Sequence, residues 1–301
     1  MSDGSRPSWS ELATVDLTSI NDGLVPATPT ADVAIYYPNN LDPSHLAKVT
    51  PELLVSGFEE ARKIFGVAGL QLRLVWFKTG YLDPALFAVN STTPGSDIPS
   101  GRYANMYVEA ERRPGVISDE AALAFETIVG QPAGSDRIVH LVTLQDVFMD
   151  FHEQLDFRTW QLKTISTGGL SFPGYMYGAT MPRHLRGVIT ITDLTKENDS
   201  WKTIAHELGH KLMNVSHEYR GTSPQHEVRA DGGLMLYGKG TEIPEGAEGR
   251  FHYERLHRSP YVYRMAPDGT REYNPDYAGG GFYYDKIYEG ISVDLDAEAA
   301  G

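Results

Sequence analysis

The sequence predicts a mixed α/β (α+β) protein in which helices pack against a mixed twisted sheet. Two observations carry this prediction: several short apolar stretches typical of strands, and two amphipathic helical segments, one after the first strand and one after the last. The order strand, helix, strands, helix indicates helices packed against one sheet. Of the 301 residues, 41% are hydrophobic, which is sufficient for a sizeable core in one large domain or two unequal lobes.

The first strand and the first helix have clear boundaries. Residues 31–38 (ADVAIYYP) are expected to form a strand, and a helix is expected from Thr50, as N-cap, with Pro51 in the first helical position. The apolar residues of this helix recur every three or four positions and predict one buried stripe, formed by Leu54, Phe58, Ala61 and Phe65.

Further strands are expected at residues 70–77, 103–110, 137–144 and 187–193. Residues 70–77 alternate, which predicts that Leu70, Leu72, Leu74 and Trp76 share one face. The run at 137–144 is almost continuously apolar and is therefore expected to be central, with His140 as a core residue. Residues 167–187 are rich in Gly and Pro and are expected to form a long surface loop, with the edge of the sheet near 168–180.

These elements suggest three segments. Residues 1–30 form an irregular N-terminal arm, and residues 31–238 form the main domain. Within this domain, the upper lobe covers about residues 31–198. The helix expected after the last strand, together with the turn that follows it, covers about residues 199–238. Residues 239–301 are dense in Gly, Pro and Tyr and are expected to form an irregular C-terminal subdomain.

Composition excludes several classes of protein. The net charge of -14 argues against a nucleic-acid partner, since phosphates would be repelled, and no apolar run is long enough to span a bilayer. Residues 1–19 show no secretory leader, so we expect a cytoplasmic protein, one exported without a standard leader, or the processed form of a secreted one. The absence of cysteine means that any metal is held by His, Asp, Glu or Tyr.

The segment Trp201–Tyr219 (WKTIAHELGHKLMNVSHEY) contains the pattern HExxH. We expect a helix here, capped by Asp199 or Ser200. His206 and His210, four residues apart, share one face of that helix and can bind one metal ion, while Glu207 lies beside them. This arrangement predicts one catalytic Zn²⁺ and a glutamate that takes a proton from water.

The stretch HELGHKLMNVSH resembles the zinc signature of metzincin metallopeptidases, HExxHxxGxxH. Met213 and Ser216 occupy the positions of the glycine and the third histidine, whereas Asn214 and His217 stand one residue later. Asn is the best substitute for Gly in a left-handed helix end. The resemblance therefore implies one extra helical residue, which turns the helix exit by about 100°, and His217 as third ligand.

Other residues could take the third position. Glu218 is adjacent to His217, and His226 follows in the segment HEVRAD. Further along, GGLMLYG (232–238) resembles the methionine turn of the same clan. This implies that Met235 packs under the histidines and that Tyr237 helps to stabilise the oxyanion.

The resemblance implies a zinc-dependent endopeptidase that acts on a peptide or protein substrate. Two alternatives remain open: a processing peptidase of narrow specificity, and a non-catalytic zinc-binding interaction protein. Calcium has no support, because the glycine-rich turn AGGGFYYD occurs once and calcium-binding repeats come in several copies. The sequence does not specify an oligomeric state.

Overall fold

The computed structural model describes residues 7–91, 117–130, 137–154, 159–172, 185–195, 202–215, 233–235, 241–244 and 249–275. Its strands are β1 (Ser10–Glu11), β2 (Thr30–Pro38), β3 (Gln71–Gly80), β4 (Ala88–Asn90), β5 (Ile138–Thr143), β6 (Asp146–Gln154), β7 (Trp160–Ser166), β8 (Gly169–Ser171), β9 (Val188–Ile191), β10 (Val262–Met265) and β11 (Arg271–Tyr273). Its helices are α1 (Leu17–Ile20), α2 (Pro43–Leu46), α3 (Pro51–Val67), the 3-10 turn η1 (Pro84–Leu86), α5 (Asp119–Val129), α7 (Thr203–Met213) and α8 (Arg250–Arg258).

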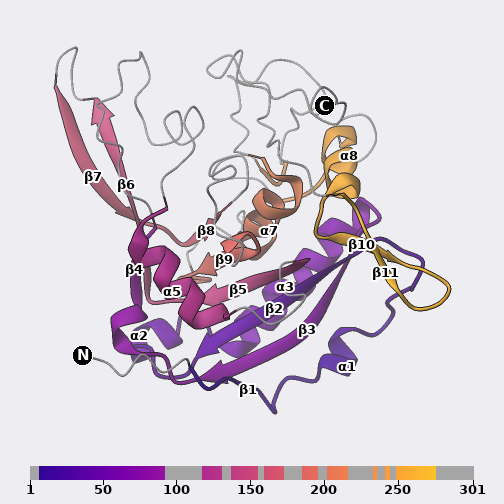
Figure 1. Cartoon of the computed structure of the whole chain (residues 1–301), viewed down its shortest axis with the longest axis horizontal. Helices are drawn as coiled ribbons and strands as arrows, with labels where there is room; N and C mark the ends of the chain where they lie inside the picture. The colour runs from indigo at the N-terminus through magenta and orange to yellow at the C-terminus, as the bar shows by residue number, and fades with distance from the viewer. Residues whose placement is uncertain are drawn as a thin grey trace.

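The main sheet has the strand order β1-β3-β2-β5-β9-β8 (Figure 1). Strands β3, β2, β5 and β9 run parallel, whereas β1 and β8 pair antiparallel at the two ends. The mixed α/β class predicted from the sequence is confirmed. So is the central position of β5, which lies between β2 and β9. The edge expected near residues 168–180 is formed by β8, the last strand of the described sheet.

Helix α3 follows the predicted pattern. The Thr50 hydroxyl accepts a hydrogen bond from the backbone N–H of Leu53 at 3.2 Å, and Pro51 takes the first turn, where no N–H is needed. The four predicted stripe residues, Leu54, Phe58, Ala61 and Phe65, are fully buried. They belong to the larger core cluster, together with residues of β2, β3 and α7.

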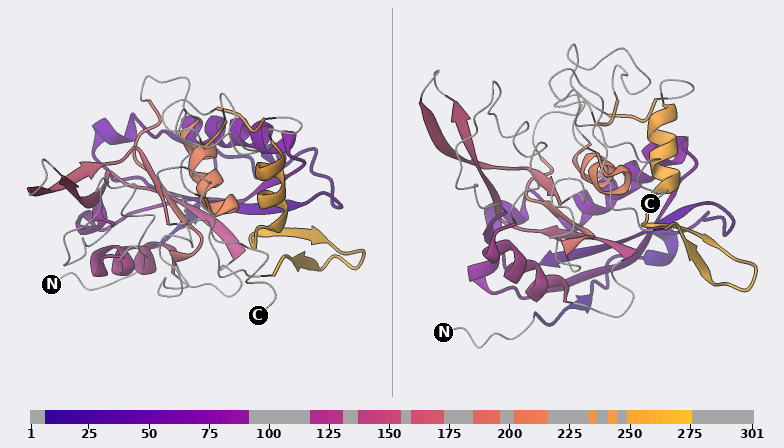
Figure 2. Two further views of the ribbon diagram at one scale, coloured as in Figure 1. Left: turned by 90° about the horizontal axis from the view of Figure 1, so that it is seen from above. Right: turned by 45° about the horizontal axis from the view of Figure 1, so that its top comes forward.

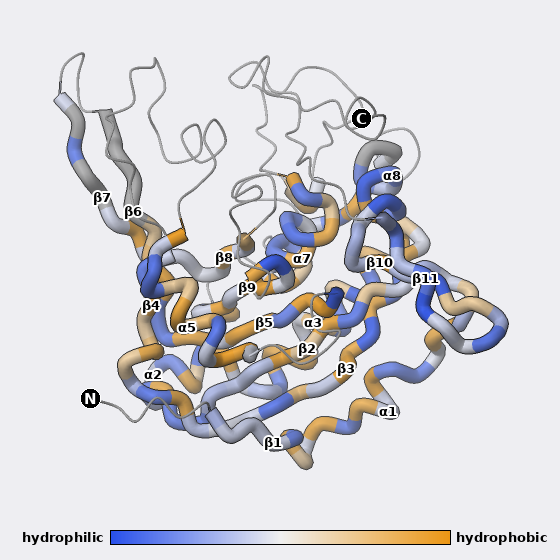
Figure 3. Tube along the Cα trace, in the orientation of Figure 1, coloured by the Kyte–Doolittle hydropathy of each residue, from blue (hydrophilic) through white to orange (hydrophobic). Residues whose placement is uncertain are grey.

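The two faces of the sheet carry separate cores. Along β2, Val33 and Ile35 face the cluster that contains α3 and α7, whereas Ala34 and Tyr36 face the cluster that contains α5. The view from above in Figure 2 shows α5 on one side of the sheet and α3 with α7 on the other. In Figure 3 apolar residues gather on the central strands, whereas α8 and β11 are mainly hydrophilic.

The expectation that Trp76 shares a face with Leu72 and Leu74 is wrong. The register between β2 and β3 shifts at Val75, because Val33 pairs with Leu74 and Ala34 with Trp76. This bulge inserts one residue and turns the following side chains over. Trp76 therefore packs against the α5 core, and Phe77 takes its place in the α3 core.

Several segments are more regular than the sequence indicates. The N-terminal arm contributes β1 and α1. Strands β6 and β7 pair antiparallel, β6 also pairs with β4, and the two strands extend away from the main sheet (Figure 1). In the C-terminal segment, α8 is followed by the hairpin β10–β11, and β10 pairs with the start of β2. The strand predicted at 103–110 lies outside the described residues. No described helix has the length and apolarity needed to cross a membrane.

Candidate metal centre

Helix α7 carries the HExxH pattern and is fixed by its apolar stripe. Ile204, Leu208 and Leu212 are buried in the larger core cluster. The helix approaches α3 closely at Gly57, where a Cβ atom would lie 2.7 Å from Cδ1 of Ile204. The predicted cap at Asp199 or Ser200 is wrong, because the helix begins at Thr203 and its N-cap, Lys202, makes no side-chain capping bond.

His206 and His210 lie together on the buried face of α7. Their ring centroids are 4.7 Å apart and the rings are nearly perpendicular, at 86°. Nδ1 of His206 is 2.8 Å from the carbonyl oxygen of Leu234, and Nδ1 of His210 is 2.7 Å from that of Val215. A carbonyl only accepts, so each Nδ1 carries the proton and each Nε2 carries a lone pair. Both rings are therefore in the tautomer that binds a metal through Nε2.

Burial keeps both imidazoles neutral. It lowers the pKa of His206 to about 4 and the pKa of His210 well below its usual range. The His206 ring lowers the pKa of His210 further. A neutral imidazole is the form that binds metal, so protons compete for His206 only in acidic solution.

The Glu207 side chain lies between α7 and the edge strand β8. An ideal Cβ on Gly169 would be 2.9 Å from both Cγ and Oε1 of Glu207, so only glycine accommodates the carboxylate at this distance. Oε2 is buried and makes no hydrogen bond to any residue that the structure describes. Burying an oxygen atom without a hydrogen-bond partner costs free energy. A water molecule or a substrate group that donates a proton could therefore bind at this position.

Lys211, one helical turn after Glu207, is the charge nearest to this carboxylate along the helix. It is buried, and its ammonium group donates a hydrogen bond to the carbonyl oxygen of Phe172. Burial raises the pKa of Glu207 to about 8 and lowers the pKa of Lys211 well below its usual range, and the charge of each group opposes the shift of the other. A cation held by the two histidines would further oppose the shift of Glu207 and favour the carboxylate.

The backbone at Leu234 and Met235 closes the other side of α7. Met235 is fully buried, and a Cβ on Gly209 would be 2.5 Å from its sulfur atom, so the thioether lies directly against the helix at Gly209. The N–H of Leu234 donates to the carbonyl oxygen of Glu242 at 2.6 Å, which anchors this segment. The carbonyl of Leu234 is thereby held in place for His206.

The helix ends as the sequence predicts. Asn214 takes the left-handed conformation, with φ 52° and ψ 52°, directly after Met213. It is the one non-glycine residue with positive φ among the described residues. The remaining site residues that the sequence predicts lie outside the described residues, namely His217, Glu218, His226 and Tyr237.

No family model matches the chain, and no curated protein matches it. The described residues also contain no group of three or more His, Cys, Asp or Glu side chains that could hold a metal. The assignment to the metzincins is thus wrong. Its physical weakness is visible in α7, where Met213 continues the helix at the position at which the signature requires a glycine to end it. A metal site is therefore supported only by the geometry of His206, Glu207 and His210.

Two residues that shape this site were not predicted from the sequence. Lys211 stands four residues after Glu207, and that spacing could have indicated its position on the same face. Gly169 gave no such signal, because its contact with Glu207 depends on the pairing of β8 with β9. His140, expected to be a core residue, is buried beside Tyr36, whose hydroxyl is 3.4 Å from its Nδ1.

Proposed function

We propose that the protein is a zinc-dependent hydrolase that cleaves peptide bonds. The observation that carries this proposal is the pair of backbone carbonyls that fix His206 and His210 with Nε2 as the ligating atom of each ring. Histidines that only fill a core have no need of a common tautomer on one helical face. The adjacent buried carboxylate of Glu207 supplies the acid–base group that a hydrolytic site requires.

The residues present fit a zinc ion. Two imidazole nitrogens on successive turns suit it, and the chain has no thiolate that would favour a closed structural site. When bound, zinc supplies Lewis acidity at neutral pH. Of the candidates for a third ligand, His217 follows the turn at Asn214 most directly, and Glu218 and His226 are the alternatives.

The chain's own groups would then carry the proton. Glu207 takes a proton from the attacking water through Oε2, the atom without a partner among the described residues, and then delivers it to the leaving amine. A charged Lys211 would favour the ionised form of Glu207 before the reaction. Gly169 keeps the β8 backbone close enough to hold the carboxylate in one position.

A peptide substrate is supported by the position of β8. This strand ends the described sheet, and its backbone at Gly169 touches Glu207. An extended peptide that adds to such an edge is held by main-chain hydrogen bonds, with its backbone running past the carboxylate.

The test compares wild type with Glu207→Gln and with Glu126→Gln, an exposed change on α5. Zinc content and cleavage of casein and of a peptide library are measured for each. We expect Glu207→Gln to retain zinc and to lose at least about 100-fold in rate, the usual contribution of a general base, while Glu126→Gln remains active. Cleavage of only a few library peptides would indicate the narrow processing peptidase. Zinc binding without cleavage by wild type would refute the hydrolase and favour the interaction protein.

A further inference from the structure

A cluster of two arginines and one aspartate lies on the α5 side of the sheet, away from the histidines. Asp32 in β2 is fully buried. Its carboxylate accepts two hydrogen bonds from Arg73 in β3, from Nε at 2.8 Å and from Nη2 at 2.7 Å. It also accepts a hydrogen bond from the Tyr263 hydroxyl at 2.9 Å and forms an ion pair with Nη1 of Arg271 at 2.9 Å.

The cluster has an excess of positive charge. One carboxylate faces two guanidinium groups, so the cluster carries a net charge of one. Within the described part of the chain, no second carboxylate lies within ion-pair distance of Arg73 or Arg271. The aromatic ring of Tyr263 lies against both cations, at 5.8 Å from Arg73 and 5.0 Å from Arg271, which stabilises them without neutralising them.

Several donors of the two arginines remain unused by described residues. The bonds to Asp32 occupy Nε and Nη2 of Arg73 and Nη1 of Arg271, which is also 3.5 Å from the Tyr273 hydroxyl. This leaves Nη1 of Arg73, with Nε and Nη2 of Arg271, for a ligand. The planar fork of a guanidinium matches the two oxygens of a carboxylate.

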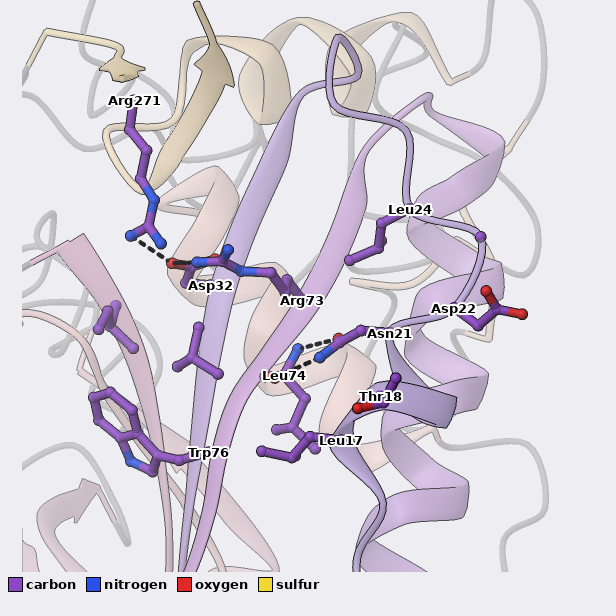
Figure 4. Close-up of a pocket in the computed structure, with 13 residues that line it drawn as sticks. Leu17, Thr18, Asn21, Asp22, Leu24, Asp32, Arg73, Leu74, Trp76 and Arg271 are labelled. Atoms are coloured by element: carbon purple, nitrogen blue, oxygen red, sulfur yellow. Dashed lines mark hydrogen bonds and ion pairs between the residues drawn. The ribbon is translucent and has the colours of Figure 1, made fainter. Parts of the chain in front are cut away.

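These donors adjoin a pocket of about 760 Å³ between the sheet and the N-terminal arm. Both arginines line it. The other lining residues are in part apolar, among them Leu17, Leu24, Val75 and Trp76, and in part polar, among them Thr18, Asn21 and Asp22. Figure 4 shows the arginines and Asp32 at one end, and Asp22 across the pocket from them. The volume falls in the range of about 300–1,000 Å³ typical of small-molecule sites.

The floor of the pocket is held rigidly. The side chain of Asn21 pairs with the backbone of β3 like an added strand residue, donating to the carbonyl of Leu74 at 2.8 Å and accepting from its N–H at 2.9 Å. Arg62 donates to the backbone carbonyls of Ile20 and Asp22, which fixes the turn after α1. The site therefore needs little ordering when a ligand enters.

We propose that this pocket binds a small organic carboxylate with an aliphatic body. Arg271 and Arg73 bind the carboxylate group, and the apolar walls contact the remainder. A single negative charge balances the cluster, and a carboxylate supplies one. Its two oxygens can accept from Nε and Nη2 of Arg271, while Nη1 of Arg73 donates to one of them. Since Asp32 and the α7 histidines lie on opposite faces of the sheet, this site is separate from the candidate metal centre and does not depend on its function.

A purely structural role is the competing interpretation, because the cluster also ties the hairpin β10–β11 to β2. A structural clamp would need only the Tyr263 hydroxyl, which ties β10 to Asp32, and Arg73, which neutralises the carboxylate. The two interpretations differ in what Arg271 does, since its removal leaves Asp32 bonded to both Arg73 and Tyr263. Arg271 is also partly exposed, so its replacement does not open the core.

The experiment is calorimetric titration of the full chain with 4-methylpentanoate, with its neutral amide and with inorganic phosphate, at constant ionic strength. We expect saturable one-to-one binding of the carboxylate with Kd of about 1 mM or tighter. Arg271→Gln should weaken it about tenfold or more, since it removes a charged hydrogen-bond donor. Arg271→Lys should recover part of the loss.

The matched control is Arg264→Gln, the same change at an exposed position of the neighbouring strand β10. This variant should bind 4-methylpentanoate with a Kd within about twofold of that of wild type, because salt screens a distant surface charge. Urea unfolding of each variant checks that it is folded. The proposal is overturned if the amide binds as tightly as the carboxylate, if phosphate binds and the carboxylate does not, or if Arg271→Gln binds as wild type does.

Discussion

A methyl group added at Gly169 should displace the Glu207 carboxylate while leaving the histidines in place. In the structure, the Cβ of Gly169→Ala would lie 2.9 Å from both Cγ and Oε1 of Glu207 and 3.1 Å from its Cδ. Favourable contacts between carbon atoms are at about 3.5–4.0 Å, so the carboxylate has to move by about 0.5–1 Å. His206 and His210 are held from other elements, by Leu234 and Val215.

This displacement should lower both the stability of the protein and the rate of cleavage. Overpacking at a buried contact costs about 1–3 kcal/mol, so the free energy of unfolding should fall by that amount. A misplacement of about 1 Å in a catalytic group can reduce the rate about 100-fold. Zinc affinity should stay close to that of wild type, because Gly169 touches the base and not the proposed ligands.

The assay combines urea unfolding, zinc content and peptide cleavage for Gly169→Ala. The matched control is Gly66→Ala in α3, where nothing lies within 4 Å of the added Cβ. Replacing a glycine inside a helix should stabilise the fold by about 0.5–1 kcal/mol and leave the rate unchanged. If Gly169→Ala has the stability and rate of wild type, the contact between β8 and Glu207 does not position the base, and the reasoning fails.

Three further predictions concern the core, the helix end and the histidines. Phe58→Ala removes a fully buried ring from the α3 stripe and should lower the free energy of unfolding by about 3–5 kcal/mol in urea titration. Asn214→Ala places a Cβ atom in a left-handed position and should be about 1 kcal/mol less stable than Asn214→Gly, which has none; equal stabilities of the two variants would contradict the helix-end assignment. Because burial lowers the pKa of His206 from 6.5 to about 4, the metal-free protein should lose stability as pH falls from 6.5 to 4, since only the unfolded chain takes up that proton. His206→Gln should remove on the order of 3 kcal/mol of this loss, and an unchanged pH profile would show that the ring is not buried.

The parts of the fold that local sequence determines were predictable. The cap and stripe of α3, the strand β2 and the end of α7 at Asn214 each depend on residues a few positions apart, whose periodicity or backbone preference is visible in the chain. The HExxH spacing likewise places His206 and His210 on one helical face, as the structure has them. These predictions needed no knowledge of tertiary contacts.

The parts that depend on long-range pairing were not predictable. Nothing in the alternating pattern of β3 shows the bulge at Val75 that turns Trp76 to the opposite face. The packing of Gly169 on Glu207 and the pairing of β10 with β2 join segments far apart in the chain. The same holds for the cluster at Asp32, whose donors come from β3, β10 and β11. Tertiary packing, not local preference, creates these features.

The measurement that tests the central claim most directly is zinc titration with X-ray absorption at the zinc edge, on wild type, His206→Gln, His210→Gln and the control His257→Gln. His257 lies on α8, where its Nε2 is 2.8 Å from the carbonyl oxygen of Ala68. We predict one zinc per chain with imidazole nitrogens at about 2.0–2.1 Å, lost in either α7 variant and retained in the control. Zinc that binds equally well to all four proteins, or to none, would contradict the assignment of His206 and His210 as metal ligands.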